Sequence, residues 1–418
     1  MTTGNDGEGD PLFTSIDPIF ARKQLLKIGH IPEADRIVGR DEEIRKLASA
    51  LNPAVFGHSP NNVLIYGKTG TGKSLCARHV TKRCREVASN QDVNVGLAFI
   101  DCSQQTTETQ AIRKIGKILN DEDATSVSIP ESGLSTAQYY DRFWKIADSL
   151  YDSVIIVLDE IDRIADDNIL MQLSRAEEAE KIRDCGLGII GISNKIDYKE
   201  RMNERVKSSL QEREYIFAPY DASKLTNIME NRDDAFKDGV LEEGVISLCA
   251  ALAAQEHGDA RKAIDIFRHA GEIAFEEESS TVGERHVRAA QELAERDRFR
   301  ELIAGIPAQA KAALLSLAQL SIHNKQHRFS TSEIFEEYER LSADVNLERL
   351  SERRVYDLLK EQAFLGVIEM NRTGGGRGQG SYMEHHLVEE PTIVRAVLQE
   401  DPRFNDLTYR DRTHFKLW

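Results

Sequence analysis

The chain has 418 residues, of which 40% are hydrophobic and 30% are charged, and its formal net charge at pH 7 is −16. This length favours roughly two or three globular domains, and no apolar run is long enough to span a membrane. The polar, acidic N-terminus lacks the apolar segment of a signal peptide, so we expect a cytoplasmic protein with no membrane partner. The negative charge excludes a nucleic-acid interface spread over the whole surface, so any DNA contact has to be local.

The cysteine and histidine patterns favour neither a disulfide framework nor a zinc site. The cysteines are odd in number and scattered, without a Cys-x-x-Cys pair, which is typical of reduced, structural thiols. His385 and His386 have no partners at the spacing of metal ligands. The cysteines are Cys76, Cys84, Cys102, Cys185 and Cys249.

The first half of the chain predicts a tail followed by a parallel-sheet domain. Residues 1–18 are rich in Gly, Asp and Thr and predict a disordered tail. In residues 19–220, short apolar runs alternate with helical stretches. Because strands of continuous apolar sequence are buried on both faces, this alternation predicts a doubly wound α/β domain. The predicted strands are Asn62–Tyr66, Gly96–Asp101, Ser153–Leu158, Gly188–Ser193 and Tyr215–Phe217.

Two further domains are predicted in the second half. Residues 221–300 place apolar side chains three and four positions apart and hold no strand candidate, which predicts a small helical domain. In residues 301–418, three helices precede two strands that flank the glycine-rich run Thr373–Gly380, an order typical of a DNA-binding winged helix. The predicted elements are helices near 307–324, 331–341 and 351–363, strands Val367–Asn371 and Ser381–Val388, and a helix from Pro391.

A phosphate-binding loop follows the first predicted strand. Residues 67–74, Gly-Lys-Thr-Gly-Thr-Gly-Lys-Ser, fit the pattern GxxxxGK[ST], in which backbone N–H groups cradle phosphates. We expect the charge of Lys73 to reach the β- and γ-phosphates and the hydroxyl of Ser74 to bind Mg²⁺. The loop therefore predicts ATP and Mg²⁺ as cofactors. The residues expected at the nucleotide are Gly70, Thr71, Gly72, Lys73 and Ser74.

Acidic and amide side chains follow two further strands. Asp159 and Glu160 come directly after an apolar strand, where Asp159 can order the Mg²⁺ shell and Glu160 can orient or deprotonate the attacking water. We expect Asp162, which comes shortly after this pair, to be a solvated residue at a helix start. Asn194 follows another strand and can hold the same water through its amide, although asparagine also favours turns in general.

Two arginines are further candidates at the nucleotide. Arg261 lies in the first turn of a predicted helix, where a cation opposes the helix dipole. A residue that is unfavourable for its own helix hints at a function. We expect Arg261 to contact the γ-phosphate from the helical domain. For Arg205 two interpretations stay open, an arginine finger presented to a neighbouring subunit or a surface charge.

The predicted helix that begins after Ser351 is the candidate for the DNA major groove. Ser351 can cap this helix, but Arg354 stands where a capping box has Glu. Cations at the start of this helix make sense if DNA phosphates or guanine edges take the place of the missing Glu as their partners. The alternative is solvated arginines paired with Glu352 and Asp357. The cations on this helix are Arg353, Arg354 and Lys360.

The glycine-rich loop adds a second candidate contact. Arg377 among glycines suits insertion into a minor groove or along phosphates, and the alternative is an exposed loop without a partner. With few phosphate contacts and a negative protein, binding should be salt-sensitive and weak for one domain. Specificity would then come from several protomers that self-associate on repeated DNA sites.

Together these motifs resemble the archaeal replication initiators of the origin-recognition-complex subunit one and cell-division-cycle six type. The resemblance extends from about Pro18 to the end of the chain, and its most specific features are Tyr220, the run Arg205–Leu210 and the terminal winged helix. The remaining matching runs are Ile31-Pro32…Arg36-x3-Arg40, Tyr66–Lys73, Val157–Asp162, Gly191–Asn194, Phe217–Tyr220 and Gly258–Arg261.

The resemblance implies an AAA+ base domain with a helical lid, and ATP held between them. It implies that Tyr220 and Arg232 contact the nucleotide and that the segment Ile31–Arg36 borders the adenine. It further implies that the winged helix and an insertion, which we place in residues 119–138, bind double-stranded origin DNA. Help in loading the replicative minichromosome-maintenance helicase is also implied.

One departure from the pattern bears on catalysis. Related AAA+ loaders carry Ser-Arg where this chain has Ser208-Ser209, which favours a slow ATPase acting as a switch. Our leading hypothesis is a nucleoid-associated replication initiator. The alternatives are a clamp-loader-like remodeler and an ATP-dependent winged-helix transcription regulator. The pair Arg353–Arg354 and Arg377 favour the initiator over the remodeler, and Glu160 disfavours a regulator with an inactive site.

Overall fold

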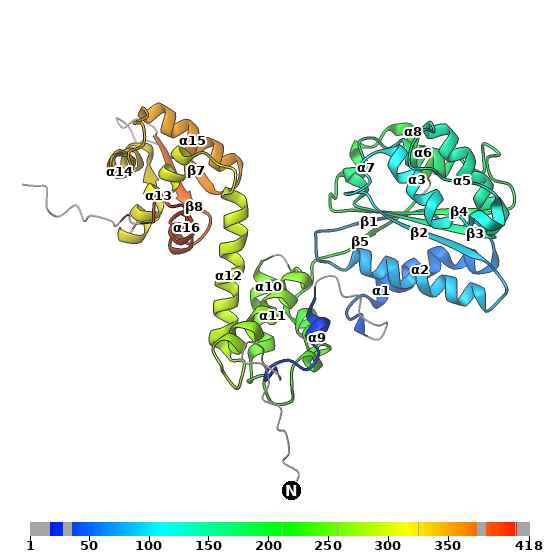
Figure 1. Cartoon of the computed structure of the whole chain (residues 1–418), viewed down its shortest axis with the longest axis horizontal. Coiled ribbons are helices and arrows are strands. Elements are labelled where there is room, and N and C mark those ends of the chain that lie inside the picture. The colour runs from blue at the N-terminus through cyan, green and yellow to red at the C-terminus, as the bar shows by residue number, and fades with distance from the viewer. Residues whose placement is uncertain are drawn as a thin grey trace, which may run out of the picture. The chain divides into compact units, whose positions relative to one another are not determined.

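The computed structural model describes residues 17–27, 36–210, 212–256, 258–324, 326–373, 382–405 and 407. The chain divides into two compact units, the first ending at Val287 and the second beginning at Arg288 (Figure 1). Most of the tail predicted at residues 1–18 lies outside the described residues. Within the described part, no helix combines the length and apolarity needed to cross a membrane.

A parallel sheet forms the centre of the first unit. Its five strands lie in the order β2-β3-β4-β1-β5, and every neighbouring pair is parallel. Every residue of β4 is buried, as is every residue of β3 except the last, which explains their continuous apolar sequence. The strands predicted from sequence are all present and differ only at their ends. They are β1 (Val63–Tyr66), β2 (Val95–Asp101), β3 (Ser153–Asp159), β4 (Gly186–Ser193) and β5 (Arg213–Ile216).

Helices cover both faces of this sheet. On one face, α1 (Asp41–Leu51) and α2 (Lys73–Ser89) pack on alternate side chains such as Ile155 and Val157 of β3. The helices α3, α5 and α6 cover the other face (Figure 1). The intervening side chains of β3, such as Ile156, belong to the core on that face. The elements of that face are α3 (Glu108–Leu119), α4 (Glu122–Thr125), α5 (Thr136–Leu150), η4 (Ile161–Arg163), α6 (Asn168–Ser174), α7 (Tyr198–Arg201) and α8 (Glu204–Leu210).

The rest of the first unit is helical, as predicted for residues 221–300. The lid helices are α9 (Ala222–Glu230), α10 (Val245–Gln255) and α11 (Ala260–Glu276), and α12 (Glu284–Ile303) continues into the second unit. Residues 17–27 lie against this lid. Phe20 and Phe236 close over Gly271, where an added Cβ would lie 2.5 Å from the Phe20 ring and 2.7 Å from the Phe236 ring. Because α12 runs through residue 300, no loop marks the predicted domain limit there, and the limits stay a prediction.

The second unit is a winged helix. Its helices are α13 (Ala308–His323), α14 (Thr331–Asp344), α15 (Glu352–Phe364) and α16 (Pro391–Leu398), and its antiparallel strands lie in the order β6-β8-β7. Strands β7 (Ile368–Thr373) and β8 (Tyr382–Leu387) match the prediction. The sequence analysis missed β6 (Phe329–Ser330), because two residues are too short to show an alternating pattern. Residues 374–381, including Arg377, lie outside the described residues.

The thiols and the central histidine of the winged helix belong to the protein core. All five cysteines are buried, and burial raises the pKa of Cys249 to about 12, so these thiols resist ionisation. The side chain of His385 is fully buried, its Nε2 lies 2.9 Å from Thr331 Oγ1, and burial lowers its pKa to about 4. His385 is therefore a neutral packing residue at physiological pH.

Replacing Ile156 by Ala should destabilise the first unit by about 2–5 kcal/mol, because the fully buried side chain leaves a cavity between β3 and the helices above it. Ile216→Ala is a matched control, since Ile216 is 67% exposed on edge strand β5 and should cost less than about 1 kcal/mol. The measurement is urea unfolding followed by the fluorescence of Trp144 in a Trp418→Phe background. Equal losses in the two variants would contradict the assignment of the core.

Candidate functional site

The first unit contains a cavity of about 500 Å³ at the carboxyl edge of its sheet. Its lining combines the loop after β1, the start of α2, the ends of β3 and β4, and residues of the lid. Nearly all the nucleotide-site residues predicted from sequence line it. They are Gly70, Thr71, Gly72, Lys73, Ser74, Asp159, Glu160, Asn194, Tyr220, Arg232 and Arg261.

The loop between β1 and α2 is shaped by glycines and by contact with the lid. Gly70 has φ +73°, and an added Cβ would lie 1.7 Å from Asp259 Oδ1, so only glycine fits there. Asp259 in turn caps α11 by accepting from the backbone N–H groups of Arg261 and Lys262. Ala260 N donates to Gly70 O at 3.2 Å, which ties the lid directly to this loop.

Lys73 is held at the floor of the cavity. Its Nζ donates to Gly67 O at 2.8 Å, to Lys68 O at 2.7 Å and to Asn194 Oδ1 at 2.9 Å. The residue is only 5% exposed, and burial lowers the pKa of Lys73 to about 8. Its charged form therefore lacks solvation and would be stabilised by a bound anion.

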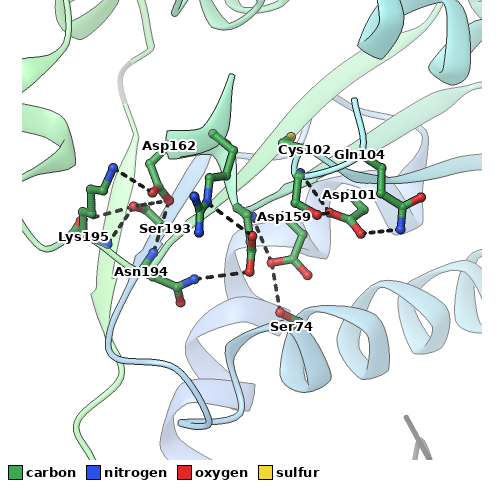
Figure 2. Close-up of polar contacts among 12 residues, drawn as sticks. Ser74, Asp101, Cys102, Gln104, Asp159, Asp162, Ser193, Asn194 and Lys195 are labelled. Carbon is green, nitrogen blue, oxygen red and sulfur yellow. Dashed lines mark hydrogen bonds and ion pairs between the residues drawn. The ribbon is translucent and has the colours of Figure 1, made fainter. Parts of the chain in front are cut away.

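The ends of β3 and β4 bring the acidic and amide side chains together (Figure 2). Ser74 Oγ donates to Asp159 Oδ1 at 3.0 Å, and burial raises the pKa of Asp159. Glu160 has a left-handed backbone, with φ 54°, which turns the chain sharply after β3. Asn194 Nδ2 donates to Glu160 Oε1 at 3.4 Å, and Arg163 Nε lies 3.7 Å from the other carboxylate oxygen.

The expectation for Asp162 was wrong. Its side chain is only 5% exposed and accepts hydrogen bonds from Ser193 Oγ at 3.0 Å and from Asn194 N at 3.4 Å (Figure 2). Burial alone would raise the pKa of Asp162, but the hydrogen bonds from Ser193, Lys195 and Asn194 outweigh it and hold that pKa below its usual value. Sequence reasoning failed here because these partners lie 31 to 33 positions away and belong to a different strand.

The cavity carries positive charge that the protein does not neutralise. In the described part of the chain, Lys73, Arg78, Arg232 and Arg261 line the cavity without a salt bridge to any carboxylate. Arg232 is 6% exposed, and its Nη1 donates to Ile228 O at 2.8 Å. Burial and the neighbouring Arg36 lower the pKa of Arg232. A buried cation without a counter-ion is costly, so the cavity is suited to a polyanion.

Two arginines of the N-terminal motif lie at the cavity: Arg36, the end of the segment expected to border the adenine, lines it, and Arg40 lies behind Tyr220. Arg36 forms a bidentate ion pair with Asp234 at 2.7 and 3.0 Å, a carboxylate that also pairs with Arg22. Arg40 is 1% exposed, and its guanidinium lies 4.1 Å from the centre of the Tyr220 ring. It also donates to Ala218 O at 2.5 Å, so it fixes the linker that carries Tyr220. Residues 31–35, predicted beside the adenine, lie outside the described residues.

Arg205 does not join the other predicted catalytic residues. It is exposed on α8 and is absent from the cavity lining that contains Glu160 and Asn194. Ser209, which stands where related loaders carry the arginine of their Ser-Arg pair, accepts a hydrogen bond from Ser174 Oγ at 3.1 Å. Both interpretations of Arg205, a finger for a neighbouring subunit or a surface charge, stay predictions.

The candidate DNA-binding helix is α15. Ser351 caps it as predicted, with Oγ accepting from Arg354 N at 3.4 Å. Glu352 bonds to Ser332 Oγ at 2.6 Å, and the pairing of the arginines with Glu352 and Asp357 is not found among the described residues. The cations left exposed on this helix are Arg353, Arg354 and Lys360.

The segment 119–138, predicted as a second DNA contact, packs against α3 and α5 in the first unit. It contains α4, and its loop is held to α3 by ion pairs from Arg113 and Lys117 to Glu131. Tyr139 Oη donates to Pro130 O at 2.9 Å and closes the loop onto α5. Its role in DNA binding stays a prediction.

Three family models match successive parts of the chain. Their descriptions are an AAA ATPase domain over residues 36–182, a Cdc6 AAA+ ATPase-type lid domain over residues 226–292, and a CDC6 C-terminal winged helix domain over residues 301–397. These matches confirm the fold predicted from sequence, an AAA+ parallel-sheet domain with a helical lid and a C-terminal winged helix.

Relatives match over nearly the full length. The chain is 57% identical to the ORC1-type DNA replication protein 4 of Halobacterium salinarum, over 96% of this chain and 97% of that one. It is 38% identical to the ORC1-type DNA replication protein of Pyrococcus abyssi, over 96% of each chain. The structure of the Aeropyrum pernix ORC1 protein in complex with DNA is similar with a TM-score of 0.67 and 35% identity, over 93% of this chain and 98% of that one. The chain therefore belongs to the ORC1-type DNA replication proteins, the family that its motifs resemble.

Proposed function

We propose that this protein is a DNA replication initiator that binds ATP in the cavity of its first unit and origin DNA through its winged helix. The observation that carries this proposal is the cavity itself, where a phosphate-binding loop, an acid pair and unneutralised cations from base and lid converge. A nucleoside triphosphate supplies the negative charge that these cations lack. Family membership supports the same conclusion.

The nucleotide would be held from both sides of the cavity. In this proposal the loop residues Gly70–Ser74 bind the phosphates, and Lys73 turns from its carbonyl partners to the β- and γ-phosphates. Arg261 would reach the γ-phosphate from the lid, and Arg232 would neutralise phosphate charge in the buried part of the cavity. Tyr220, fixed by Arg40, would contact the base or sugar. ATP would therefore connect the base to the lid.

The site also suits Mg²⁺. Ser74 Oγ and the Asp159 carboxylate are oxygen donors 3.0 Å apart, the donor type that this ion prefers. Bound there, Mg²⁺ would neutralise charge on the phosphates. Burial raises the pKa of Asp159, and a cation beside it would favour its ionised form.

Slow hydrolysis is the proposed role of the remaining residues. Glu160 would orient or deprotonate water while the Asn194 amide holds its carboxylate in place. Arg205 lies outside the cavity lining, so one protomer supplies no arginine finger from that position. Turnover should therefore be slow, and ATP would act mainly as a switch. A fast remodeler would need that finger from a neighbouring subunit.

DNA binding is assigned to α15. Arg353, Arg354 and Lys360 are exposed cations without ion-pair partners in the described part of the winged helix, in a protein whose net charge is −16. The Aeropyrum pernix relative was solved in complex with DNA, which supports a DNA-binding role here. We further propose that Arg377 contacts DNA, that protomers self-associate on origin repeats, and that the protein acts at the nucleoid by helping to load the minichromosome-maintenance helicase.

The affinity for ATP should fall as the pH rises through the pKa of Lys73, which is about 8 in the free protein. A bound triphosphate keeps Lys73 charged, so above this pH binding takes up a proton and the apparent Kd rises by up to about tenfold per pH unit. Titration calorimetry between about pH 7.5 and pH 9.5 in buffers of different ionisation enthalpy measures both quantities. Lys73→Arg, which stays charged, should give a flat profile. A wild-type Kd that is constant over this range would contradict the role of Lys73.

Glu160→Gln should lower ATP turnover at least about 100-fold and change the Kd for ATP less than about threefold, because the substitution removes only the base. Lys73→Ala should instead weaken ATP binding by at least about tenfold. Phosphate release and equilibrium titration measure the two effects. Wild-type turnover should stay below about one per second with DNA present, and a much faster rate would favour the remodeler.

An Arg353→Ala/Arg354→Ala variant should bind duplex DNA more weakly at every salt concentration. Its plot of log K against log salt should be shallower by about 2, since two phosphate contacts are lost. Fluorescence anisotropy with a labelled duplex measures both. Arg83→Ala/Arg85→Ala removes the same charge from the exposed side of α2 and should retain the wild-type slope. An unchanged slope in the α15 variant would exclude that helix as the interface.

A further inference from the structure

Asp162 is a buried carboxylate close to the cavity that does not line it. It lies on the short helix η4, two residues after Glu160, with its side chain only 5% exposed. A carboxylate is expensive to bury unless several donors satisfy it. Its position therefore calls for an explanation beyond the solvated helix start that the sequence suggested.

Three consecutive residues at the end of β4 turn toward this one carboxylate (Figure 2). Asp162 Oδ1 accepts from Ser193 Oγ at 3.0 Å and from Asn194 N at 3.4 Å, and Oδ2 lies 3.3 Å from Lys195 Nζ. Lys195 N donates back to Ser193 Oγ at 3.0 Å and tightens the turn. The carboxylate thus gathers the chain where β4 ends.

The backbone ladder between β3 and β4 does not extend this far. Its register ends at the pair Leu158 and Gly191, and the last residues of β4 pair instead with β1 on the other side. Asn194 lies beyond all these pairs. Beyond the last β3–β4 backbone pair, the hydrogen bonds of Asp162 connect the end of β4 to the turn after β3 that carries Glu160.

The position of Asn194 matters because both ends of its short side chain are in use. Oδ1 accepts from Lys73 Nζ at 2.9 Å, and Nδ2 donates to Glu160 Oε1 at 3.4 Å. One amide can make both contacts only from a narrow range of backbone positions. A shift of about 1 Å would break one or both of them, and displacements of that size are costly in catalytic sites.

We propose that Asp162 is a positioning residue that fixes Asn194 and the Glu160 turn relative to each other, so that Asn194 holds Glu160 and Lys73 in register for ATP hydrolysis. This inference rests on the proposed function, because it assigns Asp162 a part in the hydrolysis that Glu160 performs. Asp162 does not line the cavity, so it would act through Asn194. Its loss should therefore affect turnover and leave nucleotide affinity nearly intact.

The substitutions Asp162→Asn and Asp162→Ala separate charge from hydrogen bonding. Asn keeps the oxygen that accepts from Ser193 and Asn194 but loses the charge beside Lys195, so we expect about a threefold lower kcat. Ala removes every contact, and kcat should fall about 10- to 100-fold. In both variants the Kd for ATP should stay within about threefold of the wild type. Asp166→Asn, an exposed carboxylate on the same segment, is the matched control and should match the wild type.

A double-mutant cycle distinguishes positioning from a general loss of stability. If Asp162 acts through the Asn194 side chain, Asp162→Ala should lower kcat about 10- to 100-fold in the wild type and less than about twofold in an Asn194→Ala background. An equal factor in both backgrounds would overturn the proposal, as would a wild-type kcat in Asp162→Ala. If the Ala variant folds poorly, the same comparison of kcat in the two backgrounds is made with Asp162→Asn.

The same experiment separates this inference from the proposed function. Turnover of the wild type is compared first with that of Glu160→Gln. Equal rates would remove the proposed hydrolysis and, with it, the role of Asp162. A wild-type rate that depends on Glu160, together with no effect of Asp162→Ala, would overturn the positioning role alone.

Discussion

The parallel pairing of β4 with β3 on one side and β1 on the other is the constraint on which the rest of the site depends. Parallel strands end at the same edge of a sheet, so the loop after β1, the acid pair after β3 and Asn194 after β4 meet without any special loop geometry. Lys73, Asn194 and Glu160, which follow β1, β4 and β3, are then linked by hydrogen bonds at the carboxyl edge of the sheet. A slip of one residue in β4 would turn its side chains to the opposite face and break these hydrogen bonds.

In the proposed function, the charge of the cavity would connect nucleotide binding to the arrangement of base and lid. Lys73 belongs to the base, whereas Arg232 and Arg261 belong to the lid region, and none of them has a carboxylate partner in the described residues. Without a ligand these cations repel one another across the cavity. A bound polyanion reverses the sign of that interaction, so it stabilises the arrangement in which base and lid both contact it. In the proposed function, this effect of ATP binding matters more than the speed of its hydrolysis.

The features that could be predicted from the sequence are those that depend on residues close together in the chain. The loop at residues 67–74 and the cap at Ser351 depend on neighbours within a few positions, and both were found from pattern alone. The central strands β1, β3 and β4 left a continuous apolar signal because they are buried on both faces. Tyr220 and Arg232 could be named only from the resemblance. Asp162 was assigned wrongly because its partners lie on another strand, and β6 left no pattern because it is two residues long.

The acidity of the protein gives the exposed cations of α15 a meaning they would not have in a basic protein. With a net charge of −16, most of the surface repels a phosphate backbone, and the repulsion grows as salt is diluted. In the proposed function, Arg353 and Arg354, which are exposed and have no ion-pair partner among the described residues, would be the points where that repulsion is reversed. The position of the proposed interface would therefore depend on repulsion of DNA by the rest of the surface as much as on attraction by these arginines. Helix α15 carries as many acids as cations, so in this proposal the exposed Arg353 and Arg354 at its first turn, and not the net charge of the helix, would decide which face of the winged helix approaches DNA.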